Sequence, residues 1–324
     1  MKYYRSILSG ILSIFMFCTF CSPAFAAELV KNDESDQYKL VLDEDNNYEF
    51  VGEISFADFD IAVVNDSQIA VTPKLNVQNE NAEEQGTGSL QAFFDRYPQI
   101  EKCLASKISN GEEPVAVSYT DVPLKWVDDH YERYSSSDHF SSSTSQGADG
   151  NFLLYATLDY DHSYTTPSGE ITRYYTVNTY GDWVKHSVLG GKDYPDAGYD
   201  YVHQTVPNTF SIESTSFSCR YDDNTSGTSS EYSEQDGGDS FTEYRVKDDP
   251  LGYKQLDSFV LTSEVYAPAS ASTRLVHSYY THTWKSLTVT PTVSVNTNKE
   301  VQLSITPSIK ENSWTIHNRL SFTM

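Results

Sequence analysis

The segment HSYYTHTWK, residues 277–285, brings two histidines, two tyrosines and a tryptophan together within nine positions. Imidazole nitrogens bind transition metals, and aromatic rings stack on sugars or fill a core. Because side chains alternate between the two faces of a strand, His277 and His282 are expected to point to opposite faces. A metal site that used both would need a bulge between them. A shared face is predicted for Tyr280, His282 and Trp284. This face is either a sugar-binding platform or core, and the frequency of buried tryptophan in β-sandwiches favours core.

A second set of candidate ligands begins at Asp222. Asp222, Asn224 and Ser226, followed by Gly227, match the first half of an EF-hand calcium loop. The twelfth position, where the loop needs a glutamate, is Ser233, and no helical pattern flanks the segment. An ordinary acidic loop is therefore the favoured interpretation, with calcium as a candidate cofactor.

A third acidic segment, GKDYPDAGYD, contains Asp193, Asp196 and Asp200. Three carboxylates in a short loop can gather around calcium. A polar turn is the simpler interpretation of the same residues, and it is the one favoured here.

The cysteines suggest a disulfide. Four are present, and Cys103 and Cys219 are the two that lie outside the first 26 residues. In an exported protein two remaining cysteines are expected to pair. The bridge would close a loop of about 115 residues and contribute about 4–5 kcal/mol in the chain-entropy model. The alternative is a nucleophilic thiol, which needs a histidine nearby in space.

The first 26 residues have the pattern of a secretory signal peptide. Lys2 and Arg5 precede an apolar run over 7–20, and Ala24-Phe25-Ala26 fits the small-x-small cleavage rule. Cleavage near Ala26 and an extracellular location are predicted. The apolar run is shorter than the roughly 20 residues of a spanning helix, which favours a cleaved peptide over a membrane anchor. No later stretch is long and apolar enough to span, so no integral membrane helix is expected after cleavage.

The charge of the chain limits its partners. The formal net charge is −24 at pH 7. Such a surface repels nucleic acid and anionic lipid, so no nucleic-acid partner is expected. Solubility explains this charge more simply than a dedicated calcium role does.

One helical zone is predicted over 89–110. Ser89 is a good N-cap, and apolar residues then recur at helical spacing. Pro98 interrupts the pattern, so a kink or a restarted helix is expected there. Asn110 and Gly111 end it.

Most of the remaining chain alternates with period two, which is typical of half-buried strands. The sequence predicts a mainly β protein, with an antiparallel, β-sandwich-like C-terminal part and a smaller N-terminal α+β part. The expected divisions are an acidic region over 27–134, a Ser-rich linker or loop over 135–150 and an antiparallel domain over 151–324.

The clearest hairpin is predicted near the C-terminus. Pairing about the turn at 296–300 places Val295 opposite Val301, Val293 opposite Leu303, and Pro291 opposite Ile305. The apolar residues then share one face, as a correct register requires. Because the hairpin prolines spoil pairing on their outer sides, it should be edge-like or loosely joined to its neighbours.

These observations favour a secreted, non-enzymatic binding protein. Its candidate partners are extracellular polysaccharide, cell wall or another protein. No G-x-S-x-G, H-E-x-x-H, Walker or dinucleotide motif is present, which lowers the expectation of catalysis. The first alternative is an extracellular glycan-acting hydrolase that uses Asp and Glu carboxylates. The second is an outer-membrane β-barrel, because the last strands alternate cleanly.

Overall fold

The structure is a computed structural model. It describes residues 39–74, 90–127, 130–140, 148–185, 198–206, 210–221, 226–227, 231–233, 240–248, 256–270, 273–284, 289–295, 301–307 and 312–323. The predicted signal peptide and its cleavage site lie outside these residues.

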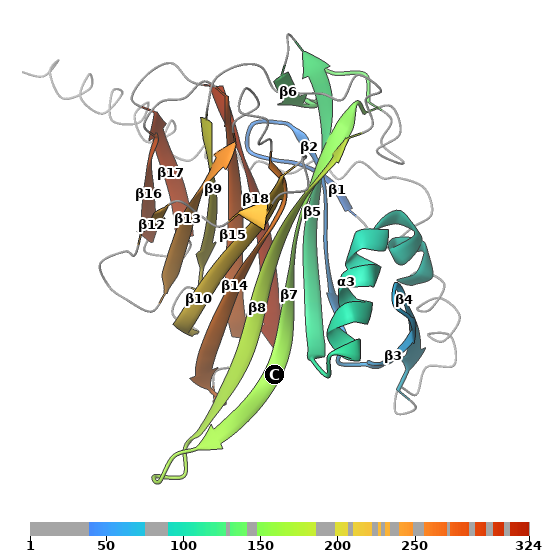
Figure 1. The fold of residues 1–324 in the computed structure, drawn as a ribbon, viewed down its shortest axis with the longest axis vertical. Coiled ribbons are helices and arrows are strands. Elements are labelled where there is room, and N and C mark those ends of the chain that lie inside the picture. The colour runs from blue at the N-terminus through green and yellow to red at the C-terminus, as the bar shows by residue number, and fades with distance from the viewer. Residues whose placement is uncertain are drawn as a thin grey trace, which may run out of the picture.

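The chain folds mainly into two antiparallel sheets that pack face to face, in a β-sandwich-like arrangement (Figure 1). The larger sheet has the order β1-β2-β5-β7-β8-β14-β10-β11, and β6 pairs with β5. Its strands are β1 Lys39–Leu42, β2 Tyr48–Ser55, β5 Glu113–Val127, β6 His130–Arg133, β7 Gly150–Thr165, β8 Ile171–Lys185, β10 Ser211–Tyr221, β11 Ser226–Gly227 and β14 Leu256–Pro268. The fold class expected from the sequence is therefore confirmed.

The smaller sheet has the order β12-β13-β9-β15-β18. Its strands are β9 Gly198–Thr205, β12 Glu231–Ser233, β13 Phe241–Asp248, β15 Thr273–Trp284 and β18 Asn312–Thr323. Between the sheets lies an aromatic core in which Phe152 of β7 stacks on Tyr280 of β15, with ring centroids 4.2 Å apart. Such stacked pairs add to the free energy gained by burying the rings.

The acidic N-terminal region shares the larger sheet with the rest of the chain. β2 pairs with β5, and β5 pairs with β7. The Ser-rich segment follows β6 in sequence and precedes β7, and both of these strands pair with β5. The strands before and after this segment thus build one sheet.

The helical zone packs on the outer face of the larger sheet. Residues 90–96 are helical, Tyr97 breaks the run, and α3 covers Pro98–Ser109. The predicted interruption at Pro98 is confirmed, and Gly111, with φ of +83°, follows the end of α3. No helix in the described part of the chain has the length and apolar character needed to cross a membrane.

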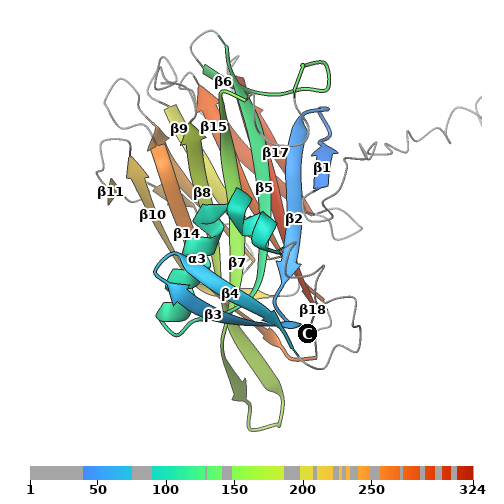
Figure 2. The same ribbon diagram turned by 90° about the vertical axis from the view of Figure 1, so that its right-hand side faces the viewer.

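The hairpin of β3 Phe59–Asn65 and β4 Gln68–Pro73 lies beside α3 on the same side of the sheet (Figure 2). Together they enclose a second core, distinct from the one between the sheets. Its buried members are Phe56, Ile69, Leu90, Phe93, Phe94, Tyr97, Ile100, Leu104, Ala105, Val117, Tyr119, Leu153 and Tyr155. The larger sheet thus buries apolar side chains on both faces.

The C-terminal hairpin has the predicted register. In β16, Val289–Val295, and β17, Val301–Pro307, Val293 lies opposite Leu303 and Pro291 opposite Ile305. Among the described residues the two strands form a sheet of their own. This agrees with the expectation that their prolines weaken pairing with other strands.

The predicted disulfide is wrong for this fold. Cys103 and Cys219 are not bonded to each other. Cys103 lies on α3 and packs into the core on the outer face of the larger sheet, whereas Cys219 on β10 faces the core between the sheets. The sheet itself separates the two sulfurs, and a disulfide needs Cα atoms within about 7 Å. Sequence spacing carries no information about which face of a sheet each cysteine occupies.

Candidate functional site

Two members of the aromatic row expected on β15, Tyr280 and His282, point into the molecule. Tyr280 is 0 % exposed and His282 is 1 % exposed, both on the face that meets the larger sheet. In this conformation neither ring can stack on a sugar from solvent, so their burial supports the core interpretation. Trp284 is the last residue of β15, and its side chain lies outside the described part of the structure.

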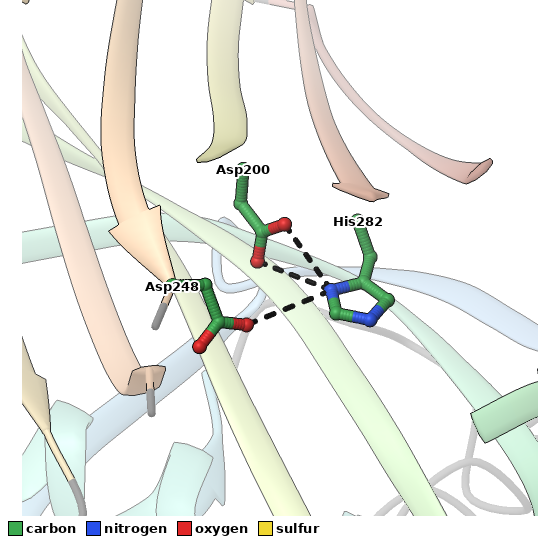
Figure 3. A group of neighbouring side chains, drawn as sticks. All are labelled: Asp200, Asp248 and His282. Carbon is green, nitrogen blue, oxygen red and sulfur yellow. Dashed lines mark hydrogen bonds and ion pairs between the residues drawn. The ribbon is translucent and has the colours of Figure 1, made fainter. Parts of the chain in front are cut away.

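His282 instead meets two carboxylates from neighbouring strands (Figure 3). Its Nδ1 atom lies 3.2 Å from both carboxylate oxygens of Asp200 on β9 and 3.8 Å from Oδ2 of Asp248 on β13. All three residues are buried, and their donor atoms lie within 4.8 Å of one another. We call these three residues the Asp-His cluster.

Strand register explains why these residues meet. β9 lies between β13 and β15 in the smaller sheet. Asp200 lies opposite Val246 on one side, while its neighbour Tyr201 lies opposite Thr281 on the other. The side chains of Asp200, Asp248 and His282 therefore project from adjacent strands on one face, near one end of the sandwich.

Further hydrogen bonds orient both carboxylates. The Tyr280 hydroxyl donates to Asp200 Oδ2, and the backbone N–H of Thr283 donates to Asp200 Oδ1 over 3.0 Å. The backbone N–H of Leu256 donates to Asp248 Oδ1 over 2.9 Å. Burial raises the pKa of Tyr280, and the nearby Asp200 carboxylate raises it further, so the hydroxyl stays protonated. The carboxylate planes are thus fixed by the chain.

Sequence reasoning found this cluster only in part. The sequence favoured a polar turn, with a calcium loop as the alternative, for the segment that contains Asp200. Asp200 instead lies within a strand, and Asp193 and Asp196 lie outside the described residues. Asp248 was missed. Tyr244, Val246 and Asp248 share one strand face, so period-two alternation would have placed this carboxylate on the buried side.

The EF-hand-like segment is described only at its end. Asp222 and Asn224 lie outside the described residues, and Ser226 is exposed on β11. The calcium hypothesis for this segment therefore stays a prediction.

A second candidate site is an open cleft of about 1100 Å³ between α3 and the outer face of the larger sheet. We call it the helix-sheet cleft. Its floor comes from side chains on β7, β8 and β14, most of them polar, and its wall from α3. Residues that line it include Gln99, Lys102, Cys103, Lys107, Glu112, Asp159, Asn178, Tyr180, Asp182 and Thr262.

A buried ion pair anchors the cleft. Lys107 Nζ lies 2.7 Å from Asp159 Oδ2 and 2.7 Å from Glu112 Oε2. Asn178 also donates to Asp159 Oδ2, over 3.1 Å. Burial would lower the pKa of Lys107, but the Asp159 and Glu112 carboxylates together raise it. The ammonium is therefore charged at neutral pH.

The other carboxylate oxygen of Asp159 has different surroundings. Asp159 is 3 % exposed, and its Oδ1 atom has no hydrogen-bond partner among the described residues. Burial raises the pKa of Asp159, against the opposing effect of Lys107. A buried acceptor in this position can take a hydrogen bond from an ordered water.

Tyr180 and Asp182 line the same cleft from β8. The Tyr180 ring stacks on that of Tyr155, with centroids 4.7 Å apart. Burial raises the pKa of Asp182 to about 6, and the nearby Asp257 carboxylate contributes to the rise. Burial also raises the pKa of Cys103, so its thiol stays protonated and is a poor nucleophile.

Sequence reasoning missed the helix-sheet cleft. Thr176, Asn178, Tyr180 and Asp182 occupy alternate positions of β8, and the residues between them face the core. The alternation was visible in the sequence, but it did not reveal that α3 would lie beside this polar face.

Comparisons with known proteins do not identify the chain. No family model and no curated protein matches it. Among solved structures, it is similar to Clostridium perfringens delta-toxin at 9 % identity, covering 62 % of this chain and 93 % of the toxin, with a TM-score of 0.28. It is also similar to a structure described as a pore forming protein at 7 % identity, covering 87 % of this chain and 96 % of that one, with a TM-score of 0.22. TM-scores this low support no functional argument.

Proposed function

We propose that this chain is an exported, non-enzymatic protein that binds extracellular polysaccharide or cell-wall glycan in the helix-sheet cleft. The observation that carries the proposal is the lining of this cleft. Carboxylate, amide and hydroxyl groups converge there beside the half-buried ring of Tyr180. Small-molecule sites combine an open concavity with a few fixed polar groups in this way.

The chemistry of the lining fits a polyhydroxylated ligand. Each sugar hydroxyl both donates and accepts hydrogen bonds. Asp159 and Asp182 offer acceptors, Lys102 offers donors, and Asn178 offers both. The unpartnered Oδ1 of Asp159 is buried, so a water molecule would have to bridge it to a bound sugar. The aromatic ring of Tyr180 adds apolar contact area for a sugar face.

Export is part of the proposal and rests on the sequence of the first 26 residues. Sequencing the N-terminus of the protein recovered from culture medium tests it. We expect a mature chain that begins just after Ala26. A chain that keeps Met1 and remains inside the cell would contradict export.

The binding test is co-sedimentation of the mature chain with insoluble wall material and polysaccharides. Tyr180→Ala and Asp182→Asn are expected to reduce the bound fraction at least tenfold. Tyr164→Ala, which removes a ring that is 53 % exposed outside the cleft, is a matched control and should bind as the wild type does. Equal binding by all three variants would exclude the cleft, and no sedimentation of the wild type would exclude the proposal.

One observation favours an extracellular glycan hydrolase as the second candidate. The helix-sheet cleft contains Asp159 and Asp182, and burial raises the pKa of each. A raised pKa is typical of the general acid in glycoside hydrolysis. Release of reducing sugar that disappears in Asp182→Asn, while binding persists, would establish this alternative. Binding without any turnover would favour the first.

A further inference from the structure

The Asp-His cluster lies on the opposite side of the larger sheet from the helix-sheet cleft. We propose that it is a divalent transition-metal site, best suited to Zn²⁺, that fixes one end of the sandwich. Its protein ligands are Nδ1 of His282, one carboxylate oxygen of Asp200 and Oδ2 of Asp248, and a water molecule would complete the tetrahedral set. This inference is independent of glycan binding.

The first argument is geometric. Zn²⁺ holds nitrogen and oxygen ligands at about 2.0–2.2 Å, so two ligands in a tetrahedral set lie about 3.4 Å apart. Nδ1 of His282 is 3.2 Å from the Asp200 oxygens and 3.8 Å from Asp248 Oδ2. The longer distance exceeds that of a hydrogen bond, yet it lies close to the separation of two ligands around one ion.

The second argument is the number of hydrogens available. Nδ1 of an imidazole carries at most one hydrogen. Three carboxylate oxygens from two residues surround this atom within 3.8 Å. One N–H cannot point at all three, whereas one cation can attract all of them. A neutral His282 would then offer its Nδ1 lone pair to the ion.

The third argument is charge. Asp200, Asp248 and His282 are 0 %, 5 % and 1 % exposed. Two carboxylates and a neutral imidazole carry a charge of −2, which Zn²⁺ neutralises. Since burying net charge costs free energy, a neutral set is the most favourable state for these three side chains at this depth.

The surroundings resemble an outer shell of a metal site. The Tyr280 hydroxyl and the Thr283 N–H hold Asp200, and the Leu256 N–H holds the Asp248 oxygen that faces away from His282. Such partners orient ligands and tune their affinity. The mixed nitrogen and oxygen donor set favours Zn²⁺ over Ca²⁺ and Mg²⁺, which prefer oxygen alone.

The test is metal analysis of the purified mature chain. Elemental mass spectrometry should find one zinc per chain after purification in zinc-containing buffer and dialysis. Removal by a strong chelator should lower Tm by several degrees, and added Zn²⁺ should restore it. Co²⁺ in place of Zn²⁺ should give the visible absorption of a tetrahedral ion.

Variants locate the site. Asp248→Asn and His282→Gln are expected to weaken zinc binding by more than about 100-fold, whereas Tyr280→Phe, which alters an outer partner, should cost about 10–100-fold. His162→Gln is the matched control, because His162 and Asp161 form an exposed pair at 2.9 Å. This variant should bind zinc as the wild type does.

Two results would overturn the proposal. One is a wild-type chain whose zinc content stays well below one and whose Tm responds to neither chelator nor Zn²⁺. The other is zinc retained undiminished in Asp248→Asn and His282→Gln, which would place the ion elsewhere. Circular dichroism of each variant establishes that it is folded, and the chelator measurement on the wild type holds even where a variant does not fold.

Discussion

The larger sheet separates two polar clusters that balance the charge of buried carboxylates in different ways. On its outer face, the Asp159 carboxylate meets the Lys107 ammonium at 2.7 Å beside an open cleft. On its inner side, Asp200 and Asp248 meet an imidazole within the enclosed core between the sheets. The pKa of Lys107 is raised by its carboxylate partners, so its ammonium stays charged at neutral pH, whereas a histidine is charged only when it binds a second ring proton. The outer cluster therefore carries its own cation, and the inner one is suited to accept one.

The largest expected effect comes from removing the cation of the outer cluster. Lys107→Met leaves Asp159 buried without its partner, which should lower the free energy of unfolding by about 3–5 kcal/mol. Urea unfolding at neutral pH measures it. Lys102→Met, an exposed position on the same helix, is the control and should change little. If both variants are equally stable, the ion pair between Lys107 and Asp159 does not stabilise the folded chain.

The next effect concerns the Asp-His cluster. Tyr280→Phe removes the donor to Asp200 and the acceptor of the Trp183 N–H, which lies 3.2 Å from the hydroxyl. Leaving buried partners unsatisfied should cost about 2–3 kcal/mol. Tyr164→Phe, where the ring is exposed, should cost nothing measurable. Thermal unfolding compares the two, and a neutral Tyr280→Phe would show that the Asp200 carboxylate is satisfied by other means.

A smaller effect is the pH dependence of stability that comes from Asp182 in the helix-sheet cleft. The folded-state pKa of Asp182 is raised from 3.8 to about 6. Its contribution to stability is therefore full below about pH 4 and is lost as pH rises through 6. Because the side chain is partly exposed, we expect the loss to be about 1 kcal/mol. Asp182→Asn should flatten this part of the stability curve and raise stability at pH 7, as measured by urea unfolding between pH 4 and 7. An unchanged slope would contradict the raised pKa.

The smallest expected effect tests the separation of the two faces. Because Cys103 and Cys219 lie on opposite sides of the larger sheet, a reducing agent should leave Tm unchanged. Peptide mapping under non-reducing conditions should find no peptide that joins them. A linked peptide, together with a fall in Tm on reduction, would mean that α3 and β10 are arranged differently in solution.

Local rules predicted the elements well. The interruption at Pro98 follows from the missing N–H and fixed φ of proline, and both are properties of one residue. The pairing of Val293 with Leu303 follows from period-two alternation around a short turn. In each case the interacting residues are neighbours in sequence, so their pattern determines their geometry.

The sequence by itself thus determined a mainly β chain, its helix break, its C-terminal register and its large negative charge. Tertiary structure alone decided which side chains meet. His282 reaches Asp200 across 82 positions of sequence, and Lys107 reaches Asp159 across 52. Strand order and face set these contacts, and both depend on pairing between distant segments. For the same reason Tyr280 and His282 of β15 became core, and two cysteines that looked like a pair lie on opposite faces of one sheet.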